Sequence, residues 1–198
     1  MGGKDMAMIT IRQERVSDFT AREKLLDDAL GVARFDKSSE RLREDRLPSQ
    51  GLSFVAAEDG RVVGTIRLWD ISTGPGRPAV LLGPLAVAAT ARKRGIGASL
   101  MTRALREAHK RGHRAVLLVG DAPYYGRFGF SVEKTGALWM PGAYERHRLL
   151  GLELVPGALD AARGMIAPTG RPVPKPDLAA LVAGVNNHNA RRAERRAA

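Results

Sequence analysis

The stretch Arg92-Lys93-Arg94-Gly95-Ile96-Gly97 lies between an apolar run, residues 79–87, and a segment with helical periodicity that reaches Arg111. An apolar run of this length, bounded by turn residues, predicts a strand buried on both faces. Glycines at the start of a helix let the backbone approach a ligand closely, and the free N–H groups of the first turn point to the same place. Three adjacent bases add positive charge, so the stretch predicts a phosphate-binding turn.

Two common phosphate loops are excluded by spacing. A dinucleotide-binding fingerprint requires a third glycine at position 100, where this chain has Leu100. A Walker loop requires Lys and then Ser or Thr after its last glycine, whereas Gly97 is followed by Ala98-Ser99. A basic turn whose glycines serve close packing alone stays open as an alternative.

The sequence around this turn predicts further strands and helices. The expected strands are residues 7–12, 53–57, 62–69, 79–87, 115–119, 130–134 and 149–155, and the expected helices are 16–30, 36–46, 96–111, 122–128 and 177–182. An Asp59-Gly60 step indicates a hairpin turn between the second and third strands. Gly83-Pro84 interrupts the fourth strand, and because proline cannot donate to a sheet, we expect a bulge or a local loss of pairing there.

Charge and composition narrow the class of protein. The chain has 198 residues, no cysteine and a formal net charge of +11. The length suits one domain, and the lack of cysteine excludes disulfides, thiolate metal ligands and thiol nucleophiles. The positive excess lies in residues 91–114, which hold eight bases and one acid, and in residues 171–198, which hold six bases and two acids. No apolar run approaches the roughly 18 residues of a membrane span, so we expect a cytoplasmic protein with no membrane partner.

A second informative stretch, residues 124–130 (YYGRFGF), follows the strand expected at 115–119. In a parallel sheet this stretch and the glycine turn lie at the carboxyl ends of neighbouring strands, where such sheets bind ligands. A phenol of pKa about 10 can donate a proton to a leaving group of similar basicity. We interpret Tyr124, Phe128 and Phe130 as core aromatic residues and Tyr125 as a candidate functional residue.

The two motifs Arg92-x-x-Gly95-x-Gly97 and Tyr125-x-x-x-Gly129-Phe130, in this order and spacing, resemble the GNAT superfamily of acyl-CoA-dependent N-acetyltransferases. The resemblance covers residues 8–155. It implies an α/β (α+β) domain with a mixed central sheet of about seven strands, flanked by helices, and a V-shaped splay between the two central parallel strands. We expect one such domain over residues 1–166 and a Pro-rich linker with a basic tail over residues 167–198.

The resemblance also implies a reaction. Acetyl-CoA would be the co-substrate, with no metal, and the acceptor amine would attack it directly in a ternary complex without an acyl-enzyme. Tyr125 would be the general acid that protonates the departing thiolate. Asp121 is the carboxylate nearest in sequence that can act as general base, and helix capping is its alternative role. The coenzyme would be held by Leu85, Ala86, Val87, Arg92, Lys93, Arg94, Gly95, Ile96, Gly97 and Ala98.

The acceptor, a small-molecule or protein amine, is selected in this family by the first two helices and by the loop before the last strand, here residues 16–46 and 137–148. Acids in the first segment either face a cationic amine or lie on a solvated helix surface. They are Asp27, Asp28, Glu40, Glu44 and Asp45. In the loop, Trp139, Met140 and Tyr144 either line an apolar pocket or pack against the sheet.

Two other functions stay open. The pI near 10.8 and the Arg-rich residues 191–196 are compatible with a nucleic-acid- or ribosome-associated basic protein. Because the other segments are neutral and 5% of the residues are aromatic, any contact with nucleic acid in this alternative is expected through the basic tail alone. A non-catalytic acyl-CoA sensor is the second alternative, and the presence of Tyr125 argues against it because a sensor needs no acid. We expect a monomer or a homodimer.

Overall fold

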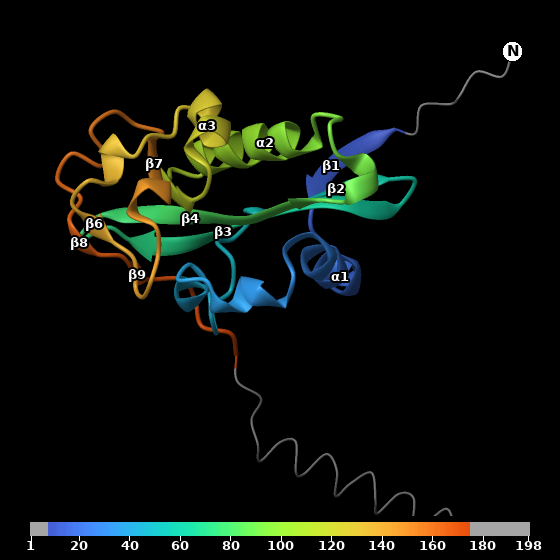
Figure 1. The fold of residues 1–198 in the computed structure, drawn as a ribbon, viewed down its shortest axis with the longest axis horizontal. Helices are drawn as coiled ribbons and strands as arrows, with labels where there is room; N and C mark the ends of the chain where they lie inside the picture. The colour runs from blue at the N-terminus through green and yellow to red at the C-terminus, as the bar shows by residue number, and fades with distance from the viewer. Residues whose placement is uncertain (1–7, 175–198) are drawn as a thin grey trace, which may run out of the picture.

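In the computed structural model, which describes residues 8–174 apart from the side chain of Val32, one sheet separates two layers of helices. The helices α2 (Ile96–Lys110) and α3 (Ala122–Tyr125) cover one face of the sheet (Figure 1). The helix α1 (Phe19–Leu30) and the 3-10 turns after it cover the other face. The expected mixed α/β architecture is therefore confirmed.

The central sheet has seven strands in the order β1-β2-β3-β4-β5-β7, with β9 paired to β3. These strands are β1 (Ile9–Gln13), β2 (Ser53–Glu58), β3 (Arg61–Ser72), β4 (Pro78–Val87), β5 (Ala115–Val119), β7 (Leu149–Glu153) and β9 (Ala167–Pro168). Within the described residues β4 and β5 are the one parallel pair of this sheet. A small second sheet pairs β6 (Leu138–Trp139) with β8 (Gly164–Met165).

The apolar pattern explains how α2 is fixed on the sheet. Leu100, Met101 and Ala104 form one face of α2 and are fully buried against Ile66 and Leu68 of β3. The β2–β3 hairpin turns at Asp59 and Gly60, which have φ values of 47° and 78°, the left-handed conformation that two-residue hairpin loops require. The start of α2 lies close to the end of β4, because a Cβ atom on Gly97 would be 3.7 Å from Cγ2 of Val87.

The two parallel strands separate soon after they meet. β4 and β5 pair at two positions, Val80 with Val116 and Leu81 with Leu117. Farther along, Leu82 pairs with Leu68 of β3 while Leu85 pairs with Ile66, so β4 has one extra residue at Gly83-Pro84. This is the bulge expected from the sequence. Beyond it no strand of residues 8–174 pairs with the edge of β4 that faces β5, and the expected V-shaped splay is confirmed.

Two expected elements are wrong. Residues 36–46 form 3-10 turns, η2 (Val32–Asp36) and η3 (Glu40–Leu42), instead of a helix. The segment ends in a β-bridge between Arg46 and Pro172. This backbone contact with a residue distant in sequence takes the place of the hydrogen bonds of a continuous helix. Residues 130–134 make one bridge, Ser131 to Gly151, and then turn, because the hydroxyl of Thr135 donates to the backbone of this turn and of β7.

Residues 167–173, which we expected in a linker, pack on the domain. Pro168 pairs with Ile71 of β3, and the guanidinium of Arg46 donates to the Gly170 carbonyl oxygen at 2.7 Å. The N–H of Val173 donates to the Asp45 carbonyl oxygen at 2.8 Å. The domain thus continues past residue 166. The expected helix at 177–182 and the Arg-rich residues 191–196 lie outside the described part of the chain.

Candidate functional site

The turn before α2 has the geometry of an anion site. Lys93 and Gly95 have φ values of 62° and 75°, so the backbone bends sharply just before α2 begins at Ile96. Ser99 donates to the Gly95 carbonyl oxygen at 3.0 Å, so the three N–H groups before Ser99 have no helical acceptor. Gly95, the residue at the N-cap position, has no side chain that could cap them. These N–H groups and the positive end of a 15-residue helix point at the same space.

A cavity of about 410 Å³ lies over this turn, and we call it the loop cavity. Seven of the residues expected to hold the coenzyme line it: Val87, Arg92, Lys93, Gly95, Ile96, Gly97 and Ala98. A Cβ atom on Gly97 would lie 3.1 Å from the hydroxyl of Tyr124 and 3.7 Å from Cγ2 of Val87. The volume of the loop cavity therefore depends on position 97 being a glycine, which has no side chain.

The three other expected coenzyme residues lie outside this cavity. Arg94 forms a two-point ion pair with Glu58, at 2.6 and 3.2 Å. Ala86 is buried, and Leu85 lines a second cavity described below. The Arg94–Glu58 pair keeps the Arg94 guanidinium on the hairpin side of the turn.

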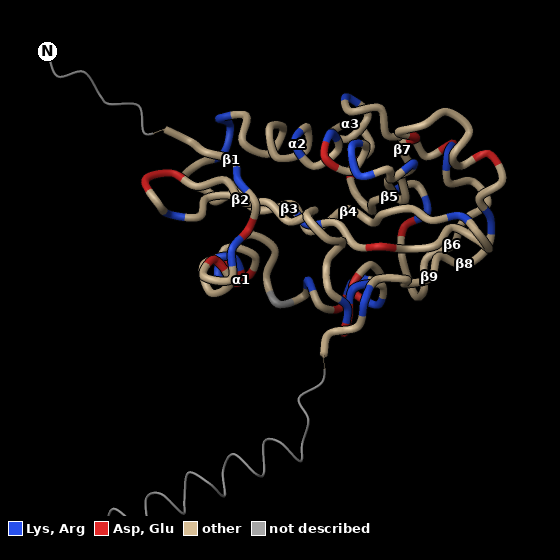
Figure 2. Tube along the Cα trace, turned by 180° about the vertical axis from the view of Figure 1, so that it is seen from behind, with Lys and Arg blue, Asp and Glu red and all other residues tan. Residues whose placement is uncertain are grey.

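The positive charge of residues 91–114 is spread more widely than the sequence suggested. Figure 2 shows basic positions along the length of α2. Arg103 lies over the ring of Phe54, and Arg111 pairs with Glu107. Of the eight bases in this segment, Arg92 and Lys93 line the loop cavity. The net charge of this segment is thus partly a property of the surface of α2.

A second cavity, of about 450 Å³, opens where β4 and β5 separate, and we call it the splay cavity. One wall is formed by residues 81–85 of β4 and 118–120 at the end of β5, together with Tyr124, Tyr125 and Asp121. The opposite wall is formed by side chains from α1 and the 3-10 turns. Arg148, which precedes β7, also lines the cavity, and its backbone carbonyl oxygen accepts from the Gly120 N–H at 2.9 Å. Tyr124 lines both cavities, although we had expected it to be a core residue.

The two tyrosines pack edge to face, with ring centroids 4.9 Å apart. Tyr125 also packs against Phe130, which is buried as expected. Burial raises the pKa of the Tyr125 phenol to about 12, and the positive charge of Arg148 opposes part of this rise. Tyr125 therefore stays protonated at physiological pH, as a proton donor must.

Asp121 occupies the N-cap position of α3, yet its carboxylate makes no capping hydrogen bond. Its backbone carbonyl oxygen, rather than its side chain, accepts from the N–H groups of Tyr124 and Tyr125, at 3.0 and 3.1 Å. Within residues 8–174 no ion pair engages the carboxylate, which is exposed and borders the splay cavity. The structure thus leaves this carboxylate available to a ligand.

The acids of residues 16–46 are mostly neutralised by neighbouring bases. Arg34 donates to Asp27 at 3.0 Å and to Glu23 at 2.6 Å, and Arg43 pairs with Glu40 at 2.6 Å. Of the five acids considered above, Glu40 alone lines the splay cavity. We find no sequence signal, beyond their lying in the two acceptor segments, that would have selected the bases that line this cavity: Arg34, Lys37, Arg43 and Arg148.

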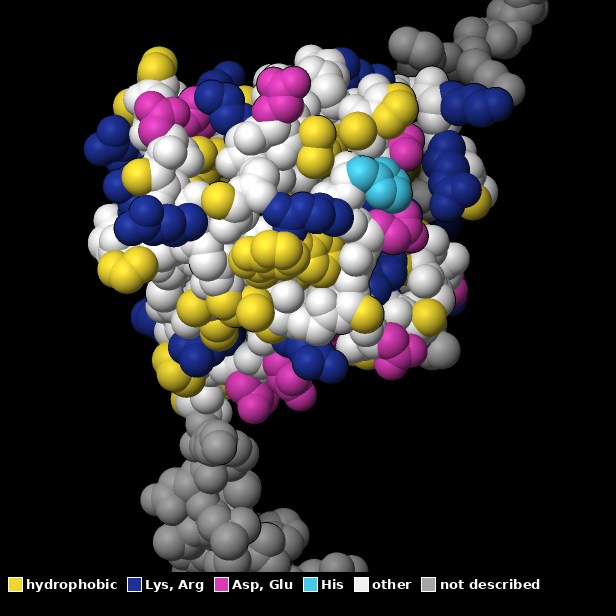
Figure 3. Space-filling view, turned by 60° about the vertical axis from the view of Figure 1, so that its left-hand side comes forward, with side chains coloured by type: hydrophobic (Ala, Val, Ile, Leu, Met, Phe, Trp, Pro, Cys, Tyr) yellow, Lys and Arg dark blue, Asp and Glu magenta, His cyan; other side chains and the backbone are white. Residues whose placement is uncertain are grey.

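The aromatic residues of the loop before β7 lie away from both cavities. Met140 is buried, and Tyr144 packs against the same core cluster. Trp139 is 51% exposed, with the Arg146 guanidinium over its ring. Figure 3 shows the end of the molecule that carries β6 and β8, where hydrophobic side chains gather between charged ones. These residues therefore pack or face outward instead of lining an acceptor pocket.

Two further observations concern ligands and membranes. Within residues 8–174 no cluster of three or more histidine or acidic side chains is arranged to hold a metal ion. In that same part of the chain, no helix combines the length and the apolar character needed to cross a membrane.

Comparison with known proteins agrees with this geometry. The model of the Acetyltransferase (GNAT) family matches residues 11–130. Over 116 residues the chain is 34% identical to "Uncharacterized N-acetyltransferase YhbS" of Escherichia coli K12, which covers 54% of this chain and 68% of that protein. The crystal structure of Escherichia coli YhbS in complex with CoA has a TM-score of 0.71 and 26% identity, covering 84% of this chain and 93% of that one.

A second solved structure, a GNAT family acetyltransferase from Brucella melitensis in complex with acetyl-CoA, has a TM-score of 0.61 and 28% identity. The match covers 81% of this chain and 96% of the chain in that structure. The family match spans more than half of the chain and includes β4, the glycine turn and residues 124–130. The resemblance drawn from the two motifs is thereby confirmed, and the chain belongs to the GNAT acetyltransferase family.

Proposed function

We propose that this chain is an acyl-CoA-dependent N-acetyltransferase that transfers an acetyl group from acetyl-CoA to a primary amine. The observation that carries the proposal is the relation between the two cavities. The loop cavity presents free helical N–H groups, the splay cavity presents the unpaired edge of β4, and Tyr124 lines both. Both solved relatives described above contain CoA or acetyl-CoA.

The residues present fit the coenzyme. A pyrophosphate needs several N–H donors and positive charge without a side chain in the way, and Gly97, Arg92 and Lys93 meet these needs. A pantetheine arm needs an extended partner with free backbone groups, which the edge of β4 at Leu85 and Val87 offers after the bulge. We therefore assign the coenzyme to the residues expected from the sequence, with Arg94 and Ala86 in supporting positions.

Bound acetyl-CoA supplies a thioester carbonyl carbon that an amine can attack directly, with no acyl-enzyme. In our proposal the carboxylate of Asp121, directly or through a water, takes the proton that the amine must lose. The phenol of Tyr125 gives its proton to the departing thiolate sulfur. Tyr125 suits this role because burial keeps it protonated, and Asp121 suits its role because its carboxylate is free and borders the same cavity.

A thiol-release screen tests the proposal. Purified full-length chain is mixed with acetyl-CoA and with small amines, amino acids, aminoglycosides, polyamines and lysine-containing peptides. We expect release of the coenzyme thiol with at least one amine and a matching mass gain of one acetyl group on that acceptor. Tight acetyl-CoA binding without release for any acceptor would favour the sensor instead, and absence of binding would overturn the proposal.

A further inference from the structure

Four bases line the splay cavity, and Lys37 and Arg148 differ from the other two in their surroundings. Within residues 8–174 neither side chain makes a hydrogen bond or an ion pair, whereas Arg34 and Arg43 of the same cavity are neutralised by carboxylates. Nε of Arg148 is buried and has no hydrogen-bond partner in the part of the chain that the structure describes. Because a buried donor without a partner is destabilising, Arg148 is suited to a ligand that supplies an acceptor.

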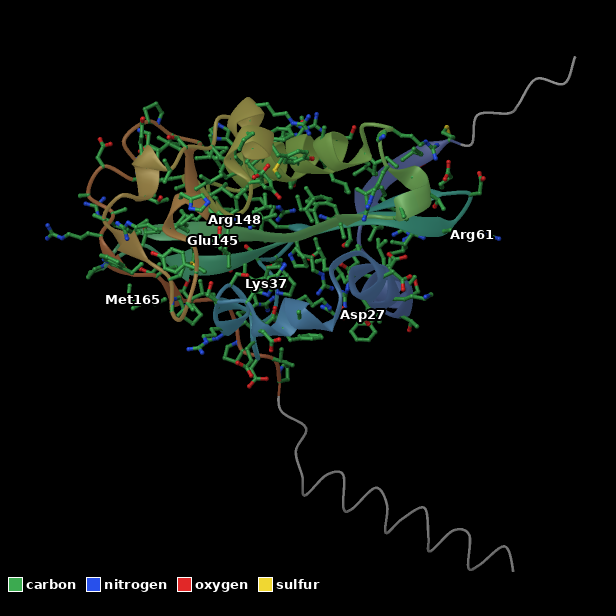
Figure 4. The ribbon with its side chains drawn as sticks, in the orientation of Figure 1. Asp27, Lys37, Arg61, Glu145, Arg148 and Met165 are labelled. Atoms are coloured by element: carbon green, nitrogen blue, oxygen red, sulfur yellow. The ribbon has the colours of Figure 1, made fainter. Side chains whose placement is uncertain are left out.

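Lys37 and Arg148 reach the cavity from different parts of the fold. In the view of Figure 4 Lys37 lies below β4, on the segment between η2 and η3, and Arg148 lies at the level of β4, on the chain that leads into β7. The carboxylate of Asp121 is the free negative charge of the same cavity within the described residues. A ligand that satisfies all three groups has an amine toward Asp121 and an anionic group toward Lys37 and Arg148.

We propose that the acceptor is a primary amine that also carries an anionic group, a carboxylate or a phosphate, which Arg148 and Lys37 bind. This inference rests on the proposed acetyltransferase function and narrows its substrate. The same arrangement disfavours polyamines and aminoglycosides, because their additional positive charges would face Lys37 and Arg148 without compensation.

The test compares acceptors that differ in the anionic group alone. The pairs are lysine with 1,5-diaminopentane, phenylalanine with phenethylamine, and phosphoethanolamine with ethanolamine. Thiol release gives kcat/KM for each, and we expect the anionic member to be preferred by about 10- to 100-fold, as for the loss of a charge-assisted hydrogen bond. The carboxylate and phosphate pairs show which anion is recognised. Equal rates, or a preference for the members without the anion, would overturn the inference.

Variants connect the preference to the two residues. Arg148→Gln and Lys37→Gln should each reduce the preference about tenfold or more, mainly by raising KM for the anionic acceptor. Arg148→Lys should restore part of it. Arg61→Gln, which removes one exposed base at the β2–β3 hairpin, is the matched control and should leave the preference unchanged. Because any effect of Arg148 on Tyr125 is common to both members of a pair, it cancels in the ratio.

A binding measurement decides the matter if none of the six amines is acetylated. The CoA-saturated protein is titrated with inorganic phosphate and with succinate while its unfolding temperature is recorded. A rise in the wild type and in Arg61→Gln that is lost in Arg148→Gln supports the anion site, and equal rises in all proteins overturn it. Failure of the proposed function is distinct, since it appears as absence of acetyl-CoA binding, or as binding without thiol release for any acceptor of the wider screen.

Discussion

Tyr124 and Tyr125 touch each other edge to face with ring centroids 4.9 Å apart, yet their roles in the site differ. Tyr124 lines the loop cavity and the splay cavity, and its hydroxyl lies 3.1 Å from the position that a Cβ atom on Gly97 would take. Tyr125 lines the splay cavity, and its ring packs against Phe130 of the core. Because the two phenols lie in such different positions, a comparison of one variant of each tyrosine can identify the proton donor.

Tyr125→Phe should lower kcat by about 10- to 1000-fold, because the departing thiolate loses its proton donor. Acetyl-CoA affinity should change by less than about twofold, since the phenyl ring keeps its packing. Tyr124→Phe is the matched control and should lower kcat by less than about threefold. Steady-state thiol release and calorimetric titration provide these values. The opposite pattern, with the large loss in Tyr124→Phe, would show that Tyr124 and not Tyr125 is the acid.

The pH dependence of turnover tests the same assignment. A raised pKa keeps a phenol protonated to higher pH, and the pKa of Tyr125 is about 12. The rate should therefore rise as the acceptor amine loses its proton and should not fall again up to about pH 10. A decrease between pH 8 and 10 that is present in the wild type and absent in Tyr125→Phe would contradict a protonated Tyr125 in this range.

Asp121→Asn should lower kcat by about 10- to 100-fold, with the greatest loss at low pH, where the acceptor amine is protonated and most needs a base. With an acceptor amine of lower pKa, the loss of kcat in Asp121→Asn should be smaller. Glu133→Gln, an exposed acid that borders neither cavity, is the matched control. Equal losses of kcat at every pH, or an unchanged kcat, would mean that a group other than Asp121 takes the proton from the amine.

The Arg12–Asp18 ion pair gives a prediction about stability. The Asp18 carboxylate accepts from both terminal nitrogens of Arg12, at 2.6 and 2.8 Å, and from the Arg15 N–H at 2.7 Å. These hydrogen bonds lower the pKa of Asp18 to about 2. A carboxylate whose pKa is lower in the folded state contributes stability above about pH 4 and loses it as the pH falls toward 2.

Asp18→Asn should therefore reduce the free energy of unfolding at pH 7 by roughly 1–2 kcal/mol. The difference from the wild type should shrink below pH 4 and vanish near pH 2, as urea unfolding at each pH would show. Asp28→Asn is the control, because its pair with Lys24 is exposed and should contribute less than about 0.5 kcal/mol. A difference that does not change with pH would mean that the ion pair is not its source.

The parts of the fold that the sequence predicted well depend on local chemistry. The Asp59-Gly60 turn, the bulge at Gly83-Pro84 and the glycine turn before α2 each require residues with a special backbone preference, which a sequence shows directly. The candidate residues Tyr125 and Asp121 could also be predicted from local sequence, because they follow β5 by a short distance in the chain.

The parts that were missed depend on contacts between distant segments. Residues 36–46 were expected to be helical, but the segment is held by Pro172 and Gly170, more than 120 residues later. Lys37 and Arg148 meet at one cavity although they are far apart in sequence, and no local pattern marks either. The role of Tyr124 was missed because an aromatic residue beside a core strand has the same pattern whether it packs inward or lines a cavity.

The central claim is that acyl-CoA binds at the glycine turn and in the gap between β4 and β5. Calorimetric titration with acetyl-CoA of the wild type, Gly97→Glu and Thr102→Glu tests it most directly. Thr102→Glu places the same charge on an exposed position of α2 that borders neither cavity. We predict one-site binding for the wild type and for Thr102→Glu and no measurable binding for Gly97→Glu. Unchanged affinity in Gly97→Glu, with the protein folded, would contradict the claim.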